Sequence, residues 1–162
     1  MVRGLSFQVY AEDVDGILCK ILESIPAEKY HWFNDLKQTE GWYYTAQGDV
    51  EPFLDRMYYT GKELLTEFRK RYMVIFLKLS AYLDKDYKEI HTYEEFYESK
   101  CEFIILAYDC NFFEIYSKNH CIIQNIYDSV RTIKSSNIQY ILDTNDERKV
   151  LDVLWVLLSN AD

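Results

Sequence analysis

The sequence is poor in residues that interrupt regular structure, and it lacks the short motifs of common enzymes. Its 162 residues include two prolines and five glycines, so helices and strands are expected to dominate. No glycine-rich phosphate loop, G-x-S-x-G elbow or H-E-x-x-H helix is present. Because active sites can combine residues far apart in sequence, these absences leave open whether the chain is an enzyme, and no residue is assigned a catalytic role.

Cysteine and histidine are scarce as well. The four cysteines form no C-x-x-C pair, and the three histidines show no metal-ligand spacing. We therefore expect no metal, no cofactor and reduced, mostly structural thiols. No apolar run is long enough to span a bilayer, and the first residues lack the apolar core of a signal peptide. These features predict a cytoplasmic protein.

Positive charge is the third shortage, because 18 basic residues face 27 acidic ones and the net charge is −9. A nucleic-acid backbone or an anionic membrane repels such a chain, so neither is expected as a partner. The one dense basic run, 69–71, suits the C-terminal end of a helix. A basic protein partner is compatible with the charge, and so is simple solubility. The sequence does not specify an oligomeric state.

Aromatic residues are abundant, with fifteen Tyr, nine Phe and three Trp. Tyrosine buries a large ring but keeps a hydroxyl group that needs water or a partner, so many rings should lie at the rim of the core. A chain of this length is normally one domain, here 1–162, and buries about 70% of its unfolded surface. Such a core needs neither a metal nor a disulfide.

Hydrophobic periodicity predicts an α+β fold: a mixed, mainly antiparallel sheet of five to seven strands with helices packed on it. The predicted strands are 5–9, 72–79, 103–108, 112–118 and 138–142, with one or two short strands in 29–46. The predicted helices are 13–25, 60–70, 122–133 and 145–158. Thr-x-x-Glu capping boxes at Thr60, Thr92 and Thr144 predict three helix starts. Strands 72–79 and 103–108 are apolar on both faces and are expected at the centre of the sheet.

The aromatic segment between the first two predicted helices is the first candidate site. Its residues are Tyr30, His31, Trp32, Asn34, Trp42 and Tyr44. They could line a groove for a sugar, a base or a peptide side chain, because pockets combine apolar walls with a few polar groups. Alternatively the rings fill the space between sheet and helix, which is the commoner role of irregularly spaced aromatics.

Further polar candidates are Asp109, in a predicted hairpin turn, and Asn145, Asp146 and Arg148, in the most polar stretch of the chain. The stretch could hold a cation or a ligand at a helix N-terminus. However, it lacks the ligand spacing of calcium loops, and helix capping by itself accounts for Thr144 and Glu147.

Five segments of the chain resemble a family of small uncharacterised proteins, a domain of unknown function, from Bacillus-like bacteria. The segments are Arg3–Phe7, Tyr30–Trp32, Tyr108–Cys110, Glu114–Lys118 and Thr144–Arg148. The resemblance implies a single cytosolic domain and no particular activity. In the family pattern a glycine often precedes the arginine of the last segment, and here Glu147 occupies that position.

The leading hypothesis is a binding or interaction protein, an acidic partner or immunity-like factor that masks a basic protein surface. It depends on the net charge, the tyrosine content and the absence of catalytic spacing. The alternative is a small-molecule-binding domain or enzyme that uses the aromatic segment, with His31 or Asp109 as acid or base.

Overall fold

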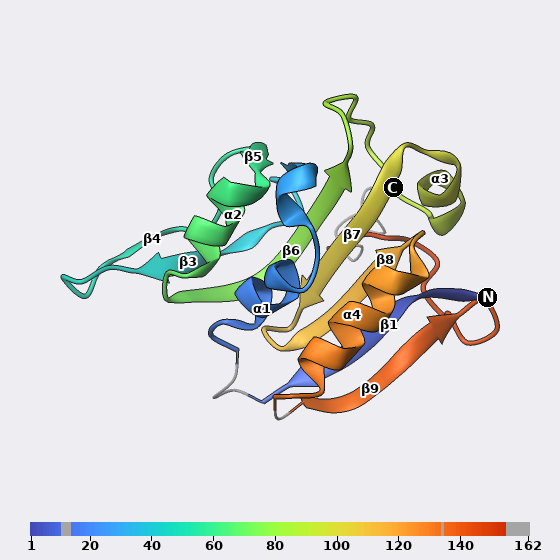
Figure 1. Ribbon diagram of the computed structural model, residues 1–162. Coiled ribbons are helices and arrows are strands. Elements are labelled where there is room, and N and C mark those ends of the chain that lie inside the picture. The colour runs from blue at the N-terminus through green and yellow to red at the C-terminus, as the bar shows by residue number, and fades with distance from the viewer. Residues whose placement is uncertain (11–13, 134, 155–162) are drawn as a thin grey trace, which may run out of the picture.

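The fold is α+β in a computed structural model that describes residues 1–10, 14–133 and 135–154 (Figure 1). The strands are β1 (Val2–Val9), β2 (His31–Asn34), β3 (Glu40–Tyr44), β4 (Val50–Pro52), β5 (Tyr58–Thr60), β6 (Tyr72–Tyr82), β7 (Cys101–Tyr108), β8 (Phe112–Ser117) and β9 (Ser135–Leu142). The helices are α1 (Ile17–Glu23), the 3₁₀ helix η2 (Ala27–Lys29), α2 (Gly61–Phe68), α3 (Tyr93–Glu98) and α4 (His120–Val130).

The strands form one large sheet in the order β4-β3-β6-β7-β8-β1-β9. The long strand β6 pairs with β3 along its first half and with β2 along its second half, and β5 extends the sheet beyond β2. The prediction of five to seven strands is therefore wrong, since the described residues form nine. The prediction of a mixed sheet also needs correction, because every strand pairing described is antiparallel. The extra strands are short ones between residues 50 and 60, where hydrophobic periodicity is too brief to detect.

Helices α1, α2 and α4 cover one face of the sheet, which we call the helical face (Figure 1). Each presents an apolar stripe to the sheet; that of α4 consists of Ile122, Ile123, Ile126 and Val130. The predicted cap of α2 is confirmed, because the Glu63 amide donates to the Thr60 hydroxyl over 3.1 Å. The capping box of Thr92 is likewise present at the start of α3. No helix in the described part of the chain is long and apolar enough to cross a membrane.

The opposite face of the sheet carries a second apolar cluster, covered by α3 and by the C-terminal segment, residues 143–154. Leu151 and Val153 of this segment are buried against the sheet. The predicted helix 145–158 is wrong for its described part, because residues 143–145 form a turn and the chain then runs without helix to Leu154. The turn is closed by the amides of Asn145 and Asp146, which both donate to the Leu142 carbonyl.

The first predicted helix also begins later than its apolar pattern. Gly16, with φ of +87°, is the N-cap, and α1 starts at Ile17. The predicted cap, Asp13, lies outside the described residues. The predicted turn between β7 and β8 is confirmed, and Asp109 and Cys110 both adopt positive φ, 50° and 69°. Tight hairpin turns favour this left-handed conformation, although glycine or asparagine usually provides it.

Candidate functional site

Three candidates from the first part of the aromatic segment, Tyr30, Trp32 and Asn34, are buried in the interior of the protein. Trp32 is fully buried, and its indole N–H donates to the Ala27 carbonyl over 3.0 Å. The Asn34 amide, also buried, donates to the Leu54 carbonyl over 2.7 Å and to the Arg56 carbonyl. Tyr30 packs edge-to-face on Trp32, with 6.0 Å between ring centroids. Trp32 and Tyr30 therefore pack in the interior, and Asn34 fixes the loop that contains Leu54 and Arg56.

His31 is half-buried, and its Nδ1 lies 2.8 Å from the Tyr58 hydroxyl. Of the six aromatic-segment candidates, Tyr44 lines one of four surface cavities formed by described residues, and the other five line none of these four. The structure thus separates the six candidates into two groups. Four lie in β2 or directly before it (Tyr30, His31, Trp32 and Asn34), and Trp42 and Tyr44 lie in β3. Ligand binding by the set stays a prediction.

Trp42 and Tyr44 belong to the β3–β4 hairpin, which extends from the edge of the sheet away from the rest of the molecule (Figure 1). Trp42 lies opposite Pro52, and Tyr44 opposite Val50. Cross-strand partners share one face of a sheet, so these four residues form a single apolar surface, which we call the hairpin patch. Val50 is 59% exposed and Tyr44 39%. The intervening Tyr43 is buried on the helical face, so the patch lies on the opposite face.

The hairpin is also acidic. Residues 40–52 include Glu40, Asp49 and Glu51 and contain no lysine or arginine. All three residues of β4, the edge strand, are exposed. An exposed edge strand with apolar side chains is rare in soluble proteins unless something pairs with it or covers it. The carboxylates of the hairpin disfavour aggregation through this edge strand when no partner covers it.

A cavity of about 290 Å³ adjoins the base of the hairpin. It is lined by Val14, Asp15, Tyr44, Arg71, Tyr72, Met73, Asp109, Cys110 and Asn111. The structure therefore brings together two sequence candidates, Tyr44 and Asp109, that lie 65 residues apart in the chain. Met73 pairs with Trp42 across β3 and β6, so the wall of the cavity is continuous with the hairpin patch.

Two of the remaining polar candidates, Asp146 and Arg148, attach the C-terminal segment to the sheet. The Asp146 carboxylate accepts from Arg3 Nη1 over 3.1 Å and from the Tyr116 hydroxyl over 3.2 Å. Arg148 Nε forms an ion pair with Glu114. The Tyr108 hydroxyl also donates to Glu114 Oε1 over 3.4 Å, so four of the five segments that carry the family resemblance contribute to this network. The side chains of its two ion pairs are 3–21% exposed.

Burial changes the acidity of this network. It raises the pKa of the Tyr116 hydroxyl well above its ordinary value, and the nearby Glu114 and Asp146 carboxylates add to the effect. Burial by itself would lower the pKa of Arg148, but the Glu114 carboxylate together with Tyr116 and Tyr108 outweighs it and the pKa is raised. The tyrosine therefore stays a neutral donor and the arginine stays charged, which suits a structural network.

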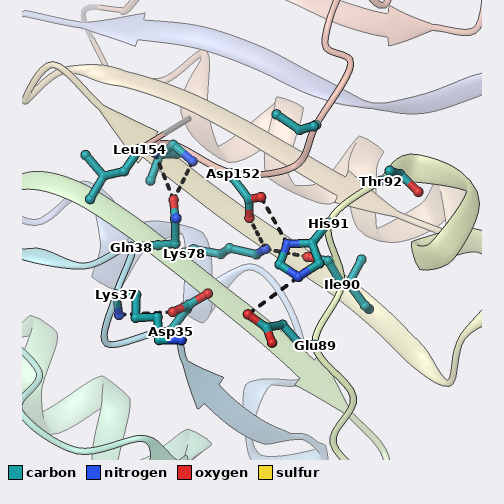
Figure 2. A network of polar contacts seen from close by, with 12 residues as sticks. Asp35, Lys37, Gln38, Lys78, Glu89, Ile90, His91, Thr92, Asp152 and Leu154 are labelled. Atoms are coloured by element: carbon teal, nitrogen blue, oxygen red, sulfur yellow. Dashed lines mark hydrogen bonds and ion pairs between the residues drawn. The ribbon is translucent and has the colours of Figure 1, made fainter. Parts of the chain in front are cut away.

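Further along the same segment, Asp152 forms a second, deeper network (Figure 2). Lys78 Nζ lies 2.6 Å from Asp152 Oδ1, and both side chains are only 3% exposed. The ammonium also donates to the Ile90 carbonyl, and His91 Nδ1 lies 3.0 Å from Asp152 Oδ2. Nearby, the Gln38 amide oxygen accepts from the amides of residues 153 and 154, each over 2.8 Å. None of the four cavities reaches Lys78.

Sequence reasoning missed Lys78, Asp152 and Glu114 as members of these networks. One signal was available: Lys78 lies in an otherwise apolar strand, and a buried ammonium requires a partner. The partner could not be identified from the sequence, because Asp152 is 74 residues away. The two networks act as anchors, since they attach the C-terminal segment to the sheet at several points.

Asn145 has a distinct place at the second edge of the sheet. Its side-chain oxygen accepts from the Leu142 amide over 2.7 Å, and its Nδ2 donates to the Tyr140 carbonyl over 3.2 Å. Both partners belong to β9, whose only described strand neighbour is β1. The side-chain amide therefore takes the position that a further strand would take, which is one way of blocking an open edge.

Replacing Asn145 by Ala should expose this edge. We expect a loss of about 1 kcal/mol in the free energy of unfolding, typical of a lost side-chain hydrogen bond. We also expect concentration-dependent self-association, measured by analytical ultracentrifugation. Gln124→Ala is the control, because Gln124 accepts from the Tyr140 hydroxyl and leaves the backbone of β9 covered. A strictly monomeric N145A protein would contradict the edge-blocking role.

Comparison with known proteins agrees with the family resemblance carried by the five segments of the sequence. Residues 2–152 match the family described as a protein of unknown function, DUF2691. The chain belongs to this family, and the resemblance noted from the sequence is confirmed. The chain is 33% identical over 159 residues to the uncharacterized protein YncE of Bacillus subtilis (strain 168). The alignment covers 94% of this chain and all of that protein. No solved structure matched the chain.

Proposed function

We propose that this protein is a binding protein that recognises a basic protein partner through the hairpin patch. The observation that carries the proposal is an exposed apolar surface on a projecting edge hairpin that has acidic residues and no basic ones. Isolated exposed apolar residues are ordinary, but these four share one face.

The composition of the patch suits a protein interface. Tryptophan and tyrosine are the residues that most often dominate binding energy, particularly when polar groups surround them and exclude water. In the hairpin the two aromatic rings lie edge-to-face, with centroids 6.5 Å apart. The surrounding carboxylates would hasten the encounter with a basic partner and disfavour acidic ones. The net charge of −9 acts in the same direction.

The aromatic segment supports the small-molecule alternative less well. The Trp32 indole N–H and the Asn34 Nδ2 donate to backbone carbonyls within the fold, and Asn34 Oδ1 accepts from the Thr39 hydroxyl. A ligand in that region would have to replace these buried hydrogen bonds, at a cost of about 1–3 kcal/mol for each group left unpaired.

The test is affinity capture from a lysate of the source cells with three full-length proteins: wild type, Trp42→Ala and Tyr97→Ala. Tyr97 is the matched control, because it is an aromatic residue on α3 that is 57% exposed. We expect the wild type and Y97A to retain one basic protein at low salt, with weaker retention at high salt. Loss of a central aromatic contact should weaken the isolated complex by about 30-fold.

Thermal melts of the three proteins check that each is folded. A captured protein that W42A retains as well as the wild type would refute the role of the hairpin patch. Capture of acidic proteins only would refute the choice of a basic partner.

A further inference from the structure

The cavity beside the hairpin has the chemistry of a pocket for one cationic side chain. We propose that it receives an arginine side chain of the partner; this inference rests on the proposed function of the hairpin patch. Tyr44 belongs to both the patch and the cavity, so a segment lying on the patch can place a side chain in the cavity. At about 290 Å³, the cavity is at the lower limit of small-molecule pockets, which suits a single side chain.

Two carboxylates line the cavity, and neither is strongly engaged. Among the described contacts Asp109 has no hydrogen bond or ion pair. Asp15 has only Arg71, whose Nε lies 3.8 Å away, and both side chains are more than half exposed. Exposed ion pairs of this length contribute little. An incoming cation would therefore find two acceptors that it can pair with at low cost.

The chain's own Arg71 shows which cation the cavity suits. Its guanidinium lies over the Tyr44 ring, with Cζ 4.9 Å from the centroid, while its Nε faces Asp15. A guanidinium in this place combines a cation–π contact with a carboxylate. An arginine of the partner would make the same two contacts, displace Arg71 toward solvent, and gain Asp109 as a second carboxylate. Its planar fork of N–H groups pairs with carboxylates more specifically than a lysine ammonium does.

The experiment is an NMR titration of the full-length ¹⁵N-labelled protein with N-acetyl-arginine amide, and in parallel with N-acetyl-citrulline amide. Citrulline has nearly the same shape and no charge. Up to roughly 10 mM probe, a range suited to millimolar affinity, we expect the arginine probe to shift the amides of 71–73 and 109–111. The citrulline probe should leave them unchanged.

Three variants make the assignment specific. Asp109→Asn should weaken binding of the arginine probe about threefold, the effect of one exposed ion pair, whereas Glu147→Gln, an exposed carboxylate that lines a different cavity, should not. Arg71→Ala should strengthen binding about threefold because the probe no longer competes with Arg71. Equal responses to arginine and citrulline, equal effects of D109N and E147Q, or no response in either the wild type or R71A would overturn the proposal.

The failure of this inference can be told apart from failure of the proposed function. If capture of a protein depends on Trp42 while the arginine probe causes no shift, the hairpin patch binds a partner without the cavity. If the probe binds while no capture depends on Trp42, the cavity binds cations and the proposed function fails.

Discussion

Replacing Asp152 by Ala should lower the free energy of unfolding by about 3–5 kcal/mol, as removal of one member of a buried ion pair usually does. The Lys78 ammonium would then be buried with the Ile90 carbonyl as its remaining described partner. The C-terminal segment would also lose its deepest attachment to the sheet. Urea unfolding followed by circular dichroism measures the change.

A double variant separates this charge effect from packing. Lys78→Met combined with Asp152→Leu removes both charges and keeps apolar volume, so we expect a stability within about 1 kcal/mol of the wild type or above it. The single D152A change should be far more harmful than the double one. If both cost the same, the contribution of Asp152 is packing and the ion pair is not the anchor.

The second large effect is expected at Gly4, in the middle of β1. A Cβ atom at this position would lie 1.9 Å from the Ile115 carbonyl oxygen of the neighbouring strand β8. Because the obstacle is backbone, no side-chain rotation can relieve it, and β1 would have to move away from β8. We expect Gly4→Ala to lower the free energy of unfolding by about 3 kcal/mol, near the upper end for overpacked sites.

Gly48→Ala is the matched control for this prediction. Gly48 has φ of +84° and no atom within 4 Å of the added Cβ, so its substitution tests left-handed strain without a clash. That strain should cost about 1–2 kcal/mol. Both values come from the same urea unfolding experiment. A Gly4 variant no less stable than the Gly48 variant would show that β1 and β8 are not held as closely as described.

Local signals in the sequence were reliable where an element is stabilised by its own residues. The boxes at Thr60 and Thr92 predicted helix starts, and both are confirmed. The same pattern at Thr144 failed. There the turn after β9 uses the amides of Asn145 and Asp146, and the side chains beyond it pair with distant strands. A capping box is worth only about 1 kcal/mol, which several buried hydrogen bonds and ion pairs exceed.

The candidate sites show the same division. Sequence reasoning selected Tyr44, Asp109, Asp146 and Arg148 as residue types suited to binding, but it could not group them. The sheet order places Tyr44 and Asp109 at one cavity, because β6 lies between β3 and β7. It places Asp146 beside Arg3 and Tyr116, because β1 lies between β8 and β9.

The sequence alone determined the α+β class, the amphipathic helices α1, α2 and α4, the β7–β8 turn and the family, because hydrophobic period, capping and short family segments are local properties of a chain. Only the tertiary structure decided that residues 143–154 run along the sheet and that Lys78 pairs with Asp152. It also decided that the candidates of the aromatic segment are divided between β2 with its approach and the projecting hairpin. These outcomes depend on which strands become neighbours. That choice minimises buried unpaired charge and exposed apolar area over the whole chain, so no short segment contains it.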